Sequence, residues 1–383
     1  MVPPTKTRGC ASWYTRRGPG AASLGTPDED QGLRLLVPCR ICVKGMYDNV
    51  ILLNEKVPML LKALSEHGKV LVPAVEGGIG KFIPYEPDCE YDLGLVNTIL
   101  PPKDALFPQT QKMYKFKTGA ESGIEEITDA DDQIIFGIRP CDVQSISCLD
   151  KVFLTLTFVD GFYARSRDKL TTIAIACTKP NPTCFCESMG VDPGGAPEAD
   201  IMLIPAEEGW SVKAQSEKGK KLIDKIGADK QAIFADGNGK PLPAAATELK
   251  VNMDGVAEKL DKLFEHPIWD DICRPCLGCG TCTFMCPTCY CFEMTSETRG
   301  AEGTESRHWD SCMFPEYSRM AGGHNPRPTG KERVRNRYMH KLCFFAQRYG
   351  MGLCVGCGRC IEKCPVGMDI TKVIDFAGEA ETV

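Results

Sequence analysis

Two stretches in the last third of the chain carry cysteines at one repeated spacing, C-x2-C-x2-C-x3-C, with proline following each. The first contains Cys276, Cys279, Cys282 and Cys286, and the second contains Cys354, Cys357, Cys360 and Cys364. Thiolate sulfur is a soft ligand, and a short loop can bring three thiolates at i, i+3 and i+6 to the corners of an iron–sulfur cubane. The duplicated run therefore predicts two [4Fe–4S] clusters.

The fourth cysteine of each run is expected to bind the cluster of the other run, as in two-cluster ferredoxins. This assigns one cluster to Cys276, Cys279, Cys282 and Cys364, and the other to Cys354, Cys357, Cys360 and Cys286. Zinc is the alternative metal, but structural zinc sites pair two short C-x2–4-C units across a longer gap. Two dense four-cysteine runs, each followed by proline, suit zinc poorly.

Four cysteines of the N-terminal half lie where one edge of a sheet is expected. Cys141 follows the apolar run 134–138 and opens a predicted helix, Cys177 follows the run 171–176, and Cys184 and Cys186 lie in the next loop. Parallel strands would gather them at the carboxyl edge, where α/β folds build sites, and the helix N-terminus would lower the pKa of Cys141. We predict a third iron–sulfur cluster at these four positions, with buried or free thiols as the alternative.

Two further features keep more than one interpretation. The element Pro-Thr-Cys-x-Cys at 182–186 recurs at 287–291, which makes Cys289 and Cys291 alternative ligands of the third cluster. The insert between the two runs is basic, with Arg327, Lys331, Arg333, Arg335, Arg337, His340 and Lys341. This basic run predicts a docking face, compensation of cluster charge, or an ordinary solvated helix face. We expect buried thiols at Cys312 and Cys343 and a structural role for His340.

Composition limits the classes of protein to consider. The chain has 383 residues, which suits two domains, and its net charge of −6 argues against a nucleic-acid binder. Its 22 cysteines occur without a secretory leader or an apolar stretch of bilayer length, so we expect metal ligands in a cytoplasmic protein without a membrane span. The chain has no Gly-rich dinucleotide motif or P-loop, so no flavin or nucleotide site is expected.

The pattern of apolar residues predicts three parts. Residues 1–45 lack periodicity and are expected to be a disordered or spurious extension, residues 46–250 an α/β domain, and residues 251–383 a mostly helical, bacterial-ferredoxin-type dicluster domain, giving an α+β chain overall. The predicted elements are helices at 57–64 and 251–264, strands at 70–75, 93–96, 134–138 and 171–176, and a hairpin at 201–214.

Several short motifs resemble one known family, the iron–sulfur subunit shared by cytosolic sulfhydrogenases, where it is the β subunit, and anaerobic sulfite reductases. They are LPPK with FPQ at 100–109, GIRPCD at 137–142, TCFC at 183–186, CPTCYCF at 286–292 and AGGHN at 321–325. The resemblance runs from about residue 46 to residue 370. It implies an electron relay that links a catalytic subunit, either a [NiFe] hydrogenase or a sirohaem sulfite reductase, with a flavin-containing diaphorase subunit.

The expected function is therefore electron transfer through [4Fe–4S] clusters within a hetero-oligomer, without net chemistry on this chain. One alternative is a stand-alone iron–sulfur reductase of a small sulfur compound, which would need an open iron site. Another is an iron–sulfur redox regulator, which would need a DNA-binding or effector module. The sequence offers neither feature, because every ligand position of the two runs is a cysteine.

Overall fold

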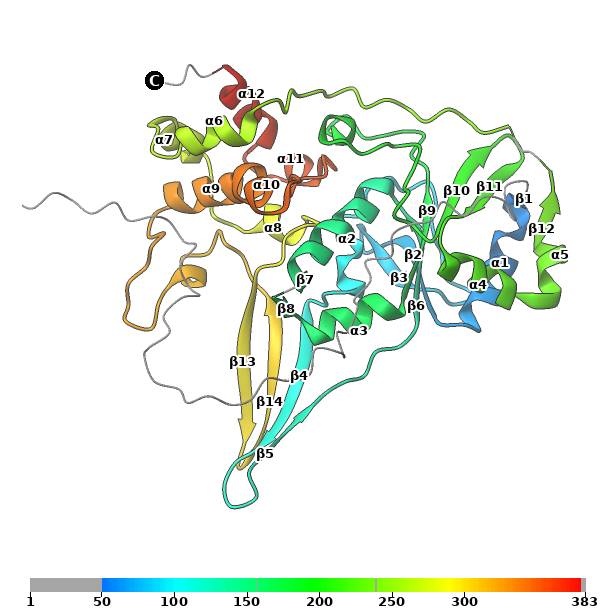
Figure 1. The fold of residues 1–383 in the computed structure, drawn as a ribbon, viewed down its shortest axis with the longest axis horizontal. Coiled ribbons are helices and arrows are strands. Elements are labelled where there is room, and N and C mark those ends of the chain that lie inside the picture. The colour runs from blue at the N-terminus through cyan, green and yellow to red at the C-terminus, as the bar shows by residue number, and fades with distance from the viewer. Residues whose placement is uncertain (1–49, 156, 238–239, 380–383) are drawn as a thin grey trace, which may run out of the picture. The chain divides into compact units, whose positions relative to one another are not determined.

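An eight-stranded mixed sheet positions the cysteines of the N-terminal half (Figure 1). The structure is a computed structural model that describes residues 50–155, 157–237 and 240–379, so the predicted extension 1–45 lies outside the described residues. The strand order is β12 (Phe234–Asp236), β1 (Val50–Leu53), β11 (Gly209–Ala214), β10 (Ile201–Ala206), β9 (Leu170–Ile175), β6 (Gln133–Ile138), β2 (Lys69–Glu76) and β3 (Ile79–Pro84). The inner strands β10, β9, β6 and β2 are parallel, and the remaining pairs are antiparallel.

Apolar residues on both faces explain why the parallel strands are central. In β6, Ile134 and Phe136 join the core that contains α1, whereas Ile135 and Ile138 join the core that contains α2. The helices of this half are α1 (Val57–Ser65), α2 (Pro140–Phe153), α3 (Gly161–Lys169), α4 (Glu217–Lys225) and α5 (Lys230–Ile233). Because the two cores lie on opposite faces of the sheet, the mixed α/β content predicted from the sequence is confirmed.

A second sheet joins segments that are far apart in the sequence. It has the order β13 (Phe292–Arg299), β14 (Glu302–Trp309), β4 (Thr110–Lys117) and β5 (Gly123–Glu126), all antiparallel. The hairpin β13–β14 lies in the insert between the two cysteine runs, so the expectation of a mostly helical C-terminal region missed it. Its polar residues on both faces hid the period-2 pattern. A short pair, β7 (Leu154–Thr155) and β8 (Phe158–Val159), completes the strands of the described residues.

The helices of the C-terminal region surround the cysteine runs. They are α6 (Val256–Lys262), α7 (Ile268–Cys273), α8 (Thr281–Phe284), α9 (Gly330–Met339), α10 (Phe345–Tyr349), α11 (Arg359–Glu362) and α12 (Ile370–Glu379). Thr329 and Glu332 form a capping box that starts α9. A π-helical turn, His340–Phe344, continues α9 into α10 and carries Lys341. Such turns are frequent at functional sites.

Two predicted elements differ from the structure. Residues 93–96 form no strand, because the carbonyl groups of Leu93 and Leu95 accept hydrogen bonds from the buried guanidinium of Arg139. The helix predicted at 251–264 is shorter, since Gly255 has a φ of 66° and only Val256–Lys262 is helical. The boundary predicted at residue 250 stays a prediction.

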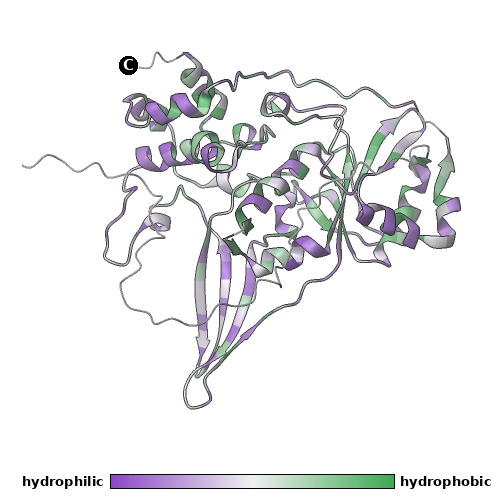
Figure 2. Cartoon of the chain, viewed as in Figure 1, coloured by the Kyte–Doolittle hydropathy of each residue, from purple (hydrophilic) through white to green (hydrophobic). Residues whose placement is uncertain are grey.

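Hydropathy follows the architecture of the described residues. Figure 2 shows apolar residues gathered on the strands of the main sheet and on the helix faces toward it. Within the part of the chain that the structure describes, no helix is long and apolar enough to cross a membrane.

Candidate metal centres

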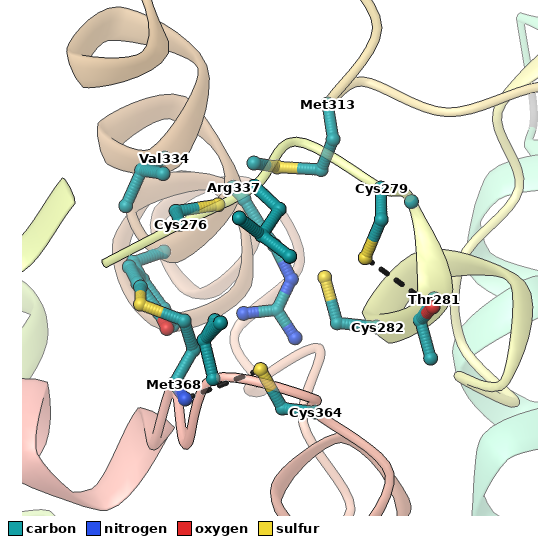
Figure 3. A pocket seen from close by; sticks show the side chains of 13 residues that line it. Cys276, Cys279, Thr281, Cys282, Met313, Val334, Arg337, Cys364 and Met368 are labelled. Carbon is teal, nitrogen blue, oxygen red and sulfur yellow. Dashed lines mark hydrogen bonds between the residues drawn. The ribbon is translucent and has the colours of Figure 1, made fainter. Parts of the chain in front are cut away.

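The four cysteines predicted to bind the first cluster line one pocket (Figure 3). Cys276, Cys279 and Cys282 come from the first run, and Cys364 comes from the second. The rest of the lining is largely apolar, including Met313, Val334, Tyr338 and Met368. The fold thus brings the fourth cysteine of one run to the first three of the other, as the crossed assignment requires.

A buried cation reaches into this first pocket. Arg337 of α9 is only 5 % exposed, and its Nε and one terminal nitrogen have no hydrogen-bond partner. Figure 3 shows its guanidinium directed among the thiols of Cys276, Cys282 and Cys364. Burial opposes the charge, yet Cys282 and its neighbours raise the pKa of Arg337 well above its ordinary value. A buried, unpaired guanidinium calls for an anion, so these residues fit an anionic iron–sulfur cluster.

The cysteines predicted for the second cluster lie next to another buried cation. Lys341 is 2 % exposed, and its Nζ donates to the Sγ of Cys286 at 3.2 Å and to the hydroxyl of Thr288 at 3.0 Å. Mutual electrostatic interactions link Cys286 with Cys354, Cys357 and Cys360.

Burial raises the pKa of Cys354 to about 12 and that of Cys357 to about 11. These thiols therefore stay protonated near neutral pH until a metal binds and displaces the protons.

A third cavity is lined by all four cysteines predicted for it, Cys141, Cys177, Cys184 and Cys186. Strands β6 and β9 are parallel, as expected, so Cys141 and Cys177 follow them at the same sheet edge. Cys357 of the second run also lines this cavity, which makes the second and third sites neighbours. Cys289 and Cys291, the alternative ligands, are not among the described residues that line it.

One electrostatic prediction for the third cavity is wrong. Cys141 lies in the first turn of α2, where the helix dipole favours a thiolate. Burial nevertheless dominates, and together with the adjacent Asp142 it raises the pKa of Cys141 well above its ordinary value. The dipole of a helix end contributes at most about 2 kcal/mol, which is less than the desolvation of a buried charge.

A buried ion pair, which no sequence pattern indicated, joins the second and third sites. Arg359 and Asp142 are each 1 % exposed, and the guanidinium donates to both carboxylate oxygens at 2.6 and 2.7 Å. The same arginine donates from Nε to the Thr98 carbonyl at 2.6 Å. Arg359 precedes Cys360 and Asp142 follows Cys141, so this pair fixes one ligand loop against the other.

Glycines of the second run allow the two loops to approach. Gly356 has a φ of 63°, and a Cβ there would lie 2.6 Å from the backbone of Cys186. Its carbonyl accepts a hydrogen bond from the Phe185 amide at 2.8 Å. A Cβ on Gly358 would meet Thr183 at 2.5 Å. Larger residues at either position would force the loops apart.

The basic run of the insert divides into two groups. Lys331 and Arg335 pair with Asp270 at 2.8 Å and Glu265 at 2.9 Å, as a solvated helix face would. Arg337 and Lys341, four residues apart, turn inward to the cysteines instead. The spacing of Val334, Tyr338 and Leu342 marks the buried face and could have revealed this. His340 bonds to the hydroxyl of Tyr290 at 2.9 Å, which agrees with a structural role.

Across the described residues, no three His, Cys, Asp or Glu side chains converge closely enough to hold a single metal ion. A cubane places its irons between the thiolates, so its ligands stand farther apart than those of a mononuclear site.

Comparison with known proteins agrees with these sites. A family model described as a 4Fe-4S dicluster domain matches residues 275–368. Sulfhydrogenase 2 subunit beta of Pyrococcus furiosus is 34% identical over 339 residues, which is 85% of this chain and 97% of that protein. The chain belongs to the iron–sulfur family of the sulfhydrogenase β subunits. A member of this family is an iron–sulfur electron-transfer subunit of an oxidoreductase.

A more distant relative of this sulfhydrogenase β family member is the β subunit of F420-dependent formate dehydrogenase from Methanocaldococcus jannaschii. It is 22% identical over 179 residues, or 44% of this chain and 38% of that protein. No solved structure matches the chain significantly.

Proposed function

We propose that this chain relays electrons between a catalytic redox subunit, either a [NiFe] hydrogenase or a sulfite reductase, and a flavin-containing diaphorase subunit. The observation that carries the proposal is the continuity of three cysteine-lined sites. Cys357 belongs to the second site and lines the third cavity, and Arg337 interacts with Cys282 of the first site and Cys360 of the second. A chain of adjoining sites suits electron relay better than chemistry on a substrate.

The ligand sets proposed are those predicted from the sequence. Cys276, Cys279, Cys282 and Cys364 hold one [4Fe–4S] cluster, Cys354, Cys357, Cys360 and Cys286 hold a second, and Cys141, Cys177, Cys184 and Cys186 hold a third. Such clusters supply one-electron transfer when bound. The protein contributes thiolates, buried cations and a dry surrounding, and a reducing compartment such as the cytoplasm suits its free thiols.

The first site is the one closest to solvent. Leu277 in its loop is 68 % exposed and Cys279 is exposed, whereas the four cysteines of the third cavity are buried. We expect one partner subunit to cover the loop around Leu277. Its apolar side chain would then be excluded from water in the complex.

The test is native purification without oxygen, with identification of the co-purifying subunits. A flavoprotein and a hydrogenase or sulfite reductase subunit should accompany the chain. The flavin-free chain should stay oxidised when NAD(P)H is added and should bleach once the flavoprotein is restored. Rapid bleaching by NAD(P)H without flavin would contradict the relay.

The third cluster has a separate test. The full chain reconstituted with iron and sulfide should lose about four iron atoms when Cys184 and Cys186 are replaced by alanine, by cubane stoichiometry. Cys343→Ala is the matched control, because this buried thiol lines neither described pocket. Equal iron content in both variants would leave the third cavity with buried thiols only.

A further inference from the structure

A second group of cysteines lies at the base of the β13–β14 hairpin. Cys291 directly precedes β13 and Cys312 closely follows β14, and the pairing of Phe292 with Trp309 brings these strand ends together. The Asp310 amide donates to the Cys291 carbonyl at 2.9 Å, and the thiols of Cys291 and Cys312 hydrogen-bond to each other. The hairpin therefore fixes two thiols from distant parts of the insert in contact.

Cys289 extends this group. It belongs with Cys291 to the repeated element Pro-Thr-Cys-x-Cys, whose first copy contributes Cys184 and Cys186 to the third cavity. The thiol of Cys289 also interacts electrostatically with those of Cys291 and Cys312. Both copies of the element thus present their two thiols to further cysteines that come from elsewhere in the chain.

A buried ammonium group faces the same thiols. Lys103 is 3 % exposed, and its Nζ donates to the Cys289 carbonyl at 2.7 Å and lies 4.0 Å from the centre of the Trp309 ring. Its nearest opposite charges are the thiol groups of Cys289, Cys286 and Cys291, and none of the ion pairs found among the described residues includes it. A charge buried in this way requires a compensating anion.

We propose that Cys289, Cys291 and Cys312 hold a further iron–sulfur cluster, distinct from the three sites above, with Lys103 as its counter-charge. Cys286 stays with the second site, so this cluster has three cysteine ligands. The fourth iron takes a non-cysteine ligand, and the hydroxyl of Tyr317, which contacts the Cys291 thiol, is the nearest candidate. A cluster fits better than zinc because no three of these side chains converge on one point.

The test uses the full chain, reconstituted without oxygen with iron and sulfide. Replacing both Cys291 and Cys312 by alanine should remove about four iron and four sulfide per chain, by cubane stoichiometry. Cys343→Ala, another buried thiol, should keep the full complement. Iron and sulfide contents equal to those of Cys343→Ala, or zinc bound in place of iron, would overturn the proposal.

Lys103→Met provides a second test that does not remove a ligand. Losing the counter-charge should shift one cluster to a more negative reduction potential while the iron content stays unchanged. Lys331→Met is the control, since Lys331 pairs with Asp270 near the surface and should shift none. Unchanged potentials for every cluster in Lys103→Met would count against the site even if the double alanine variant failed to fold.

Discussion

Replacing Arg337 by methionine should make the cluster held at the first site harder to reduce. The guanidinium is 5 % exposed, lines the pocket with the four cysteines and lacks hydrogen-bond partners for two of its nitrogens. Reduction adds a negative charge to the site, and a neighbouring positive charge stabilises that state. Methionine keeps much of the side-chain volume but removes the charge, so the potential must fall.

The size of the shift follows from Coulomb's law. A unit charge in contact with a partly polarisable protein site contributes about 2 to 4 kcal/mol at an effective dielectric constant of 20. For a one-electron couple this corresponds to about 90 to 170 mV toward negative potential. The effect should be largest for the first cluster and smaller for the second, although Arg337 also interacts with Cys360.

The assay is a redox titration without oxygen, followed by electron paramagnetic resonance. Arg337→Lys keeps the charge and should shift the potential far less. Arg335→Met removes a charge from the same helix, but that charge is paired with Glu265 and should have little effect. Potentials that are identical in Arg337→Met and Arg335→Met would refute the assignment of Arg337 to the cluster.

Three other changes have defined outcomes. Cys364→Ala should abolish the cluster whose other ligands are Cys276, Cys279 and Cys282; loss of only the cluster at Cys354, Cys357 and Cys360, seen by iron content and resonance spectra, would disprove the crossed assignment. Asp142→Asn should destabilise the chain by about 3 to 5 kcal/mol in anaerobic denaturation, because it leaves the Arg359 guanidinium buried and unpaired. Asp150→Asn, in the partly exposed pair with Arg167, is the control and should cost about 1 kcal/mol or less. Deleting residues 1–45 should leave iron content and melting temperature unchanged, and a large loss of iron would show that Cys10, Cys39 or Cys42 takes part.

Most of the cluster chemistry is visible in the order of residues alone. Cubane ligands occur at fixed local spacing, so the two runs and their crossed fourth cysteines can be recognised without coordinates. The apolar runs 134–138 and 171–176 also predicted parallel strands, and that prediction placed Cys141 and Cys177 at one sheet edge. Local patterns were sufficient because each of these features depends on neighbours in the sequence.

The meeting of charges and thiols across long sequence separations depends on the packed fold. Arg337 and Arg335 belong to one basic run, and only the packing of α9 shows that the first faces cysteines and the second faces Glu265. The pairing of Arg359 with Asp142 and the meeting of Cys291 with Cys312 depend on loop docking and on a polar hairpin that no period revealed. Burial is likewise a property of the whole fold, which is why the pKa of Cys141 rises where the helix end alone predicted a fall.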